Sequence, residues 1–358
     1  MIRKRTQKFT VARRVLRPVG AVTALAAITA AVSVSAAPII LEGNFVRTQV
    51  SDNGTLGNGS SFPGLIHDET GTGNFDSDFD YLQPGSPFEG FGVFSSQTGL
   101  GGNLNSLGGS SGSIAQVSIT DLSGTDFDNR VSWSGILDGF FEIVHDFFFD
   151  DDDENIGITT TITALTDLDN LAFSRAIDPD PDANFAGEFD TGNERGLDLN
   201  GDGDYTDAGE QAPEDYVSST GLVSDSTIAM FSNDSATHNT GIVGNCCSVT
   251  DPARYLAGGD FAVDPAGFDS EDDNGIGLGF ALGDLGVGEA VTISYFYVFG
   301  DTPISVDIPD PDPDPDPDPD PDPDPDPDPP STRVPAPATG LLFGLGLLVA
   351  ATRRRLRG

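Results

Sequence analysis

Six carboxylate or amide side chains fall between residues 198 and 210, with a spacing suited to holding a calcium ion. Counted from Asp198, oxygen side chains occupy positions 1, 3 and 5 of a loop, and a glycine at position 6 permits a sharp turn. Position 12 of such a loop normally supplies a bidentate glutamate, but here Gly209 stands there and Glu210 follows one residue late. Either Asp207 or Glu210 would therefore have to complete the shell, and position 7 would offer a backbone carbonyl. The candidate ligands are Asp198, Asn200, Asp202, Asp204, Asp207 and Glu210.

This spacing resembles the calcium loop of EF-hands and dockerins, and the resemblance implies Ca²⁺ as the cofactor. The flanking segments 187–196 and 211–215 have no helical pattern, so we expect a single loop inserted into a β-rich domain. The alternative is a turn rich in Asp and Gly that arises from composition alone. A second acidic run, 150–154, follows a hydrophobic strand pattern and is interpreted as a solvated turn.

The elements that must position this loop are strands. Through residues 37–308, short β-branched or aromatic runs alternate with clusters of Gly, Asn, Asp and Ser, and helical periodicity is almost absent. This pattern predicts an all-β fold, an antiparallel β-sandwich, with 37–112 as a candidate for an irregular lead-in. The expected strands are 39–50, 114–120, 130–137, 140–149, 156–164, 171–177, 226–231, 276–282 and 290–299.

Charge is divided sharply along the chain. Residues 37–330 contain all 57 acidic residues, five arginines and no lysine, a net charge of −52 for that segment. Nucleic acid is excluded as a partner, because phosphate binding needs clustered cations. Such self-repulsion favours cation binding, Ca²⁺ above all, or a salty medium that screens the charges. A solvated acidic surface without a specific ligand is the remaining alternative.

The two ends of the chain predict export. A basic segment and an apolar stretch precede Ala36, and the pattern predicts a signal peptide over 1–36 that signal peptidase removes. An Asp-Pro repeat at 309–330 predicts an extended linker of roughly 60 Å. In 331–358, a small Pro-rich motif precedes an apolar run and a basic cluster. The residues expected to direct processing are Val334, Pro335, Ala336, Pro337, Ala338, Arg353, Arg354 and Arg355.

This tripartite tail resembles the PEP-CTERM sorting signals of Gram-negative bacteria, with Val-Pro-Ala-Pro-Ala closest to the VPLPA type. The resemblance implies an exosortase as partner, and the cell envelope, outer surface or extracellular matrix as destination. The 15 uncharged residues 338–352 would span roughly 22 Å as a helix, short of the ~30 Å hydrocarbon core. We therefore expect transient membrane association followed by cleavage. A short permanent anchor is the alternative.

Signals for catalysis are poor, and we assign no catalytic residue. The Gly-x-Ser-x-Gly match at 108–112 lies in a Gly/Ser-rich stretch rather than between a strand and a helix. His145 and Asp146 are neighbours on an expected strand and should point to opposite faces. Arg175 is expected to pair with Asp178 or Asp180. The adjacent Cys246 and Cys247 form either a vicinal disulfide or two free thiols.

These patterns together predict an exported, acidic, calcium-associated protein of the surface or the extracellular matrix, without catalysis. A carbohydrate-binding adhesin, with extracellular polysaccharide as its partner, is the first alternative. A secreted polysaccharide hydrolase is the second, because paired carboxylates can arise from residues far apart in a sequence.

Overall fold

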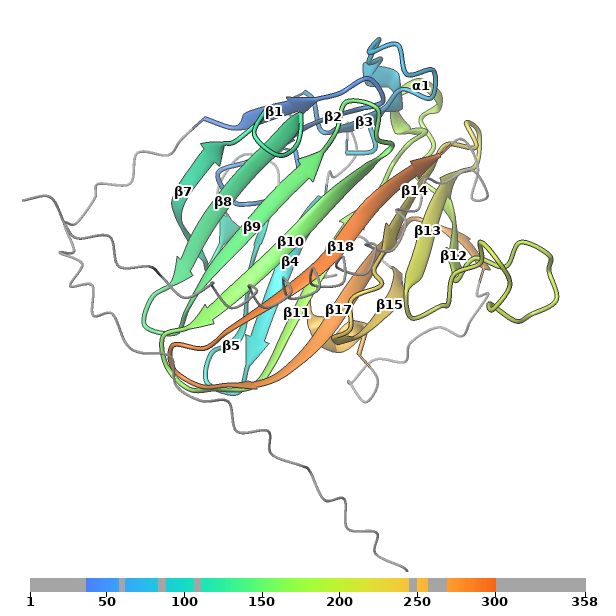
Figure 1. Ribbon diagram of the computed structural model, residues 1–358. Helices are drawn as coiled ribbons and strands as arrows, with labels where there is room; N and C mark the ends of the chain where they lie inside the picture. The colour runs from blue at the N-terminus through green and yellow to red at the C-terminus, as the bar shows by residue number, and fades with distance from the viewer. Residues whose placement is uncertain are drawn as a thin grey trace, which may run out of the picture. The chain divides into compact units, whose positions relative to one another are not determined.

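A computed structural model describes residues 37–57, 62–82, 88–105, 111–244, 250–256 and 269–300. Two large antiparallel sheets face each other across a common core, and a small third sheet lies over one end of the sandwich (Figure 1). The expected signal peptide, the Asp-Pro linker, the sorting tail and the Cys246–Cys247 pair lie outside the described residues. No helix within the described ranges has the length and apolar character needed to span a membrane.

In the described ranges the larger sheet contains nine strands, in the spatial order β16-β12-β13-β14-β18-β10-β9-β8-β7. Its strands are β7 (Ala115–Asp121), β8 (Asn129–Leu137), β9 (Phe141–Phe149), β10 (Asn155–Ala164), β12 (Thr191–Arg195), β13 (Tyr216–Gly221), β14 (Thr227–Phe231), β16 (Asp269–Asp272) and β18 (Ala290–Gly300).

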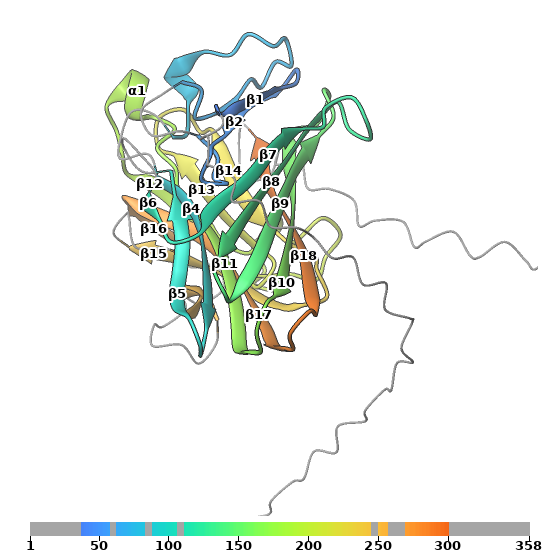
Figure 2. The same ribbon diagram turned by 90° about the vertical axis from the view of Figure 1, so that its left-hand side faces the viewer.

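The second sheet has six described strands, in the order β15-β17-β11-β4-β5-β6. They are β4 (Phe88–Ser95), β5 (Gly99–Leu104), β6 (Ser111–Gly112), β11 (Leu168–Asp178), β15 (Thr237–Gly244) and β17 (Asn274–Leu285). Figure 2 shows this sheet beside the strands β8, β9 and β10 of the larger one. The described helices are single turns: η1 (Ser77–Phe79), α1 (Ala183–Ala186) and η2 (Pro252–Arg254).

The small sheet consists of β1 (Ile39–Glu42), β2 (Val46–Val50) and β3 (Leu65–His67), paired in that order. Its apolar residues Leu41, Val46 and Leu65 are buried and belong to the same core as the two large sheets. The N-terminal segment is therefore part of the packed fold.

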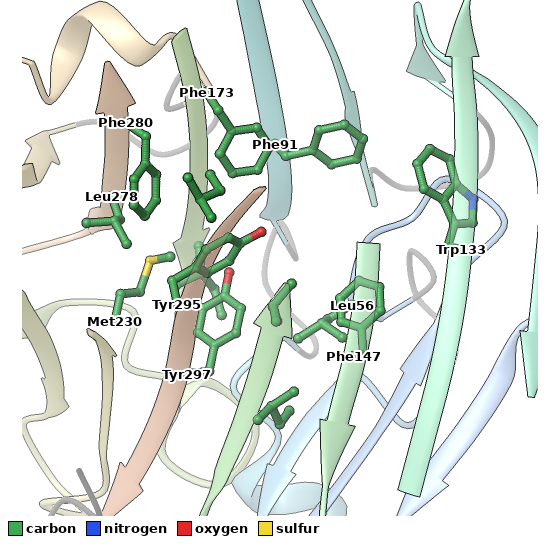
Figure 3. Close-up of a cluster of buried hydrophobic side chains, with 14 of the residues drawn as sticks. Leu56, Phe91, Trp133, Phe147, Phe173, Met230, Leu278, Phe280, Tyr295 and Tyr297 are labelled. Carbon is green, nitrogen blue, oxygen red and sulfur yellow. The ribbon is translucent and has the colours of Figure 1, made fainter. Parts of the chain in front are cut away.

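Alternating burial explains why these segments are strands. In β9, every second residue from Phe141 to Phe149 is buried, which is the period expected of a strand with one face on the core. The central strand β11 is buried over most of its length. Aromatic rings from both sheets fill the space between them, among them Phe91, Phe173 and Tyr295 (Figure 3).

The predicted all-β, antiparallel sandwich is confirmed. Eight of the nine expected strands match β7, β8, β9, β10, β11, β14, β17 and β18 to within a few residues at each end, and 39–50 is the β1–β2 hairpin. The segment considered as an irregular lead-in contributes β4 and β5 to the second sheet. β4 contains two glycines and β5 contains three, and glycine is a residue that weakens the sequence signal of a strand.

Glycine is required in these strands by close packing. A Cβ on Gly92 of β4 would collide with the backbone carbonyl of Thr250, and one on Gly102 of β5 would collide with the carbonyl of Phe91. The glycines that make β4 and β5 hard to predict from the sequence are the residues that allow neighbouring backbones to approach closely.

Candidate functional site

The loop predicted to bind calcium projects from the larger sheet, between β12 and β13. Its two ends are joined at Leu197 and Gln211, whose backbones exchange hydrogen bonds of 2.9 and 3.1 Å. The loop therefore has a fixed neck, and all six candidate ligands lie beyond it.

Asp198 organises the first half of the loop. Its carboxylate accepts hydrogen bonds from the backbone N–H groups of Gly201 at 2.6 Å and Gly203 at 2.8 Å. These bonds, with the Gly203 bond the largest contributor, hold the pKa of Asp198 below its ordinary value. Gly201 and Gly203 both have positive φ, 73° and 85°, so the turn requires glycine at these two positions.

The second half of the loop folds back on the first. The Asn200 amide donates to the Asp207 carboxylate at 2.7 Å, and the Asp202 carboxylate accepts from the backbone N–H of Asp204 at 2.9 Å. Glu210 is only 7% exposed, and its two oxygens accept from the N–H groups of Leu199 and Asp207. The Glu210 side chain, one residue past position 12, is thus turned towards the loop and away from solvent.

All six side chains offer oxygen, which is the donor type that Ca²⁺ prefers. In the structure these oxygens accept from the loop's own backbone amides or lie at its surface. In the part of the chain that the structure describes, no three His, Cys, Asp or Glu side chains converge as a ready metal-ligand set.

The three histidines occupy three different settings. His145 is fully buried and lies against Trp133, with ring centroids 5.4 Å apart. Burial lowers the pKa of His145 well below its ordinary value, so the ring is neutral. The neighbouring Asp146 points to the opposite face, where Arg130 binds it, as the strand alternation predicted.

His67 and His238 each contact one carboxylate, Glu154 and Asp215 respectively, at 2.9 Å. Within the described residues, no hydrogen bond joins either pair to the side chain of a serine, threonine or cysteine.

The expected partner of Arg175 was wrong. Its guanidinium Nε binds Glu89 at 2.6 Å, and both side chains are fully buried. Arg175 lies on β11 and points into the core, whereas Asp178 and Asp180 lie at and beyond the strand's end. The sequence showed acidic neighbours along the chain, but the cross-strand neighbour Glu89 is 86 residues away.

A second candidate site is a surface hollow that sequence reasoning missed. It has a volume of about 500 Å³ and is lined by Phe62, Asn74, Phe75, Asp76, Ser77 and Asn184. A smaller hollow of about 260 Å³ adjoins it, because Asn74 and Asp76 line both. Phenylalanine rings and amide or carboxylate groups thus lie side by side at the surface.

Neighbouring residues hold the hollow in shape. The Arg47 guanidinium lies 5.3 Å from the Phe62 ring centre and 6.0 Å from that of Phe75. Asn184, on α1, donates to the Ser77 carbonyl at 2.6 Å and so ties α1 to η1. These residues come from distant parts of the chain, and no local motif marks them.

The loop at the smaller hollow is organised by Asp68. Its carboxylate accepts from the backbone and hydroxyl groups of Thr70 and Thr72 and from the backbone N–H of Asn74. Although partial burial acts to raise it, these donors lower the pKa of Asp68 to about 2. The hollow therefore presents a fixed negative charge at any ordinary pH.

No protein-family model matches the chain, and no curated protein matches it. Among solved structures, a bacterial glucoamylase complexed with acarbose aligns with a TM-score of 0.43 and 10% identity, over 74% of this chain and 32% of that one. A GalM/aldose epimerase homologue from C. elegans aligns with a TM-score of 0.38 and 12% identity, over 74% of this chain and 100% of that one. A GH36 alpha-galactosidase from Geobacillus stearothermophilus aligns with a TM-score of 0.39 and 10% identity, over 74% and 41%. The chain spans less than half of the glucoamylase and galactosidase chains, and scores of this size assign no function.

Proposed function

We propose that this chain is an exported, acidic protein of the bacterial surface or extracellular matrix that binds Ca²⁺ and has no catalytic activity. The observation that carries the proposal is the loop 198–210, an all-oxygen donor set on a neck closed by two backbone hydrogen bonds. A net charge of −52 over residues 37–330 adds a reason to bind cations.

The proposed route to the surface comes from the two ends of the chain. Signal peptidase would cleave after Ala36, and an exosortase would process the tail near Val334–Ala338. The Asp-Pro linker would hold the sandwich away from the membrane until that cleavage. The mature protein should begin near Ala37 and lack Arg353–Arg355.

Calcium binding is tested by melting the purified protein with and without Ca²⁺. A ligand that binds only the folded state stabilises it by about 2.7 kcal/mol at a hundredfold excess over Kd. Asp202→Ala should remove the loop's share of the Ca²⁺-dependent melting shift and leave the response to NaCl unchanged.

Asp151→Ala is the matched control, because Asp151 is also an exposed aspartate but lies in the acidic turn at 150–154. It should leave both responses nearly unchanged. If Asp202→Ala keeps the full Ca²⁺ shift, the loop is a turn and calcium acts elsewhere or as a diffuse counterion.

A carbohydrate-binding adhesin is the second candidate, and the hollow beside Phe62 and Phe75 is the observation that favours it. Exposed aromatic rings next to amide and carboxylate groups suit a sugar, which has apolar ring faces and a hydroxyl rim. On a glycan array, Phe62→Ala should then weaken binding. Phe189→Ala is the control, because Phe189 is similarly exposed, 42% against 44%, but does not line the hollow. Hydrolysis of a polysaccharide by the purified protein would instead favour the hydrolase.

A further inference from the structure

The end of β11 carries three alternate aspartates, Asp178, Asp180 and Asp182, separated by prolines. A residue before proline is held in extended geometry, and in an extended chain alternate side chains point to the same side. All three aspartates are nearly inaccessible, with exposed fractions of 2%, 3% and 1%. Asp178 and Asp180 thus point to the same side of the chain, and Asp182, whose backbone is helical, follows them as a third buried carboxylate.

Asp182 has its own hydrogen-bond donors. Its oxygens accept from the backbone N–H groups of Val223 at 2.7 Å and Ser224 at 3.1 Å. Asp178 differs, because its Oδ1 is fully buried and has no hydrogen-bond partner among the residues that the structure describes. A buried carboxylate without a donor or a counter-ion is costly, so this oxygen needs a ligand or a proton.

The charges that act on Asp178 and Asp180 are other carboxylates. Asp273, between β16 and β17, acts on both, and Asp178 acts on Asp180. Together with burial, which contributes most, this raises the pKa of Asp178 to about 7 and that of Asp180 to about 8.

The chain has few cations that could compensate these charges. Arg175, the nearest arginine in sequence, is bound to Glu89 inside the core. Residues 37–300 contain no lysine, and none of the undescribed stretches inside that range contains Lys, Arg or His. A cation from solution is therefore the direct means of keeping the carboxylates of Asp178 and Asp180 ionised.

We propose that Asp178 and Asp180 form a buried two-carboxylate site for a divalent cation, Ca²⁺ in an exported protein, separate from the loop 198–210. The unpartnered Oδ1 of Asp178 supplies one ligand, and a carboxylate oxygen of Asp180 supplies another. Backbone carbonyls and water would complete the shell, as is usual for Ca²⁺. Asp273 contributes negative potential from the turn between β16 and β17.

The experiment is a count of bound Ca²⁺ per chain by equilibrium dialysis of the full exported chain, in enough NaCl to displace diffuse counterions. The wild-type protein should hold two ions. The isosteric double variant Asp178→Asn/Asp180→Asn should hold one fewer, whereas Asp202→Ala should lose the other ion. Asp182→Asn is the matched control, because Asp182 is equally buried and already bonded, and it should leave the count unchanged.

Folding of the double variant is checked by its melting temperature in EDTA, which should equal or exceed that of the wild type because two repelling buried charges are gone. A double variant that binds as many ions as the wild type would overturn the proposal, and protons alone would then neutralise the pair. A double variant that melts lower in EDTA would also overturn it, since the carboxylates would then be compensated within the chain. Loss of an ion only in Asp178→Asn/Asp180→Asn, with none lost in Asp202→Ala, would support this site and refute the loop.

Discussion

Glu89 and Arg175 form a fully buried ion pair in the core. Glu89 on β4 accepts from Arg175 on the adjacent strand β11 and from the Tyr297 hydroxyl on β18 of the opposite sheet. Its second oxygen accepts the backbone N–H of Leu56 at 2.7 Å. One buried carboxylate therefore links the two large sheets and the N-terminal segment.

Replacing Glu89 by alanine should lower the free energy of unfolding by about 3–5 kcal/mol, because Arg175 would remain charged and buried without its partner. Glu42→Ala is the control, since Glu42 forms an ion pair with Arg47 at 2.9 Å but is half exposed. Exposed pairs contribute about 1 kcal/mol at most. Urea unfolding measures both, and equal losses would show that the core pair adds nothing beyond a surface pair.

His238 predicts a pH dependence. Its ring nitrogens face two acceptors, Asp215 Oδ1 at 2.9 Å and the Ala236 carbonyl at 2.7 Å. Burial acts to lower the pKa of His238, but the hydrogen bonds to Asp215 and Ala236 outweigh it and raise the pKa above 6.5. A histidine with a raised pKa in the folded state stabilises the fold below its unfolded pKa, and this contribution is lost as pH rises through the folded value.

The unfolding free energy of the wild type should therefore fall more steeply than that of His238→Gln as pH rises above 6.5. Urea unfolding at a series of pH values checks this. Parallel pH profiles for the two proteins would mean that His238 is neutral in the fold and that its contacts do not depend on a proton.

At the scale of elements, the glycine-rich strands β4 and β5 decide how closely the chain packs. Gly92→Ala should destabilise the protein by about 1–3 kcal/mol, because the new methyl group would press on the Thr250 carbonyl. Gly192→Ala in β12 is the matched control: its nearest neighbour would be Leu222 at 3.7 Å, an ordinary contact. It should be neutral or slightly stabilising. Similar melting temperatures for the two variants would show that β4 tolerates a side chain at this position.

At the level of the whole molecule, we expect negative charge to govern how stability responds to salt. Residues 37–330 carry a net charge of −52, so melting temperature should rise with NaCl as the repulsion is screened. It should rise more with CaCl₂ at the same ionic strength, because only Ca²⁺ is also ligated. Thermal melting in the two salts measures the difference, and identical shifts would leave screening as the whole effect.

The sequence by itself determined the fold class and most of the strands of the core. Period-2 burial in β9 and β10 can be read from the residues because each strand has one face on the core. The oxygen spacing of 198–210 is also local, so consecutive residues are enough to predict a calcium loop there, and that remains a prediction. The close packing that requires glycine in β4 and β5 involves residues that are distant in the sequence. These two strands were therefore not predicted.

Tertiary structure alone decided which charges meet. Arg175 is three residues from Asp178 in the chain, but side chains three residues apart on a strand point to opposite faces, so Arg175 turns into the core towards Glu89 on the adjacent strand β4. Among the described residues, that pairing leaves Asp178 without a cationic partner, which its short distance in sequence from Arg175 did not predict. The hollow beside Phe62 likewise exists only because η1 and α1 are brought together. Local sequence patterns indicate which secondary structure a segment forms. Burial and charge pairing depend instead on which strands lie next to each other in the sheets.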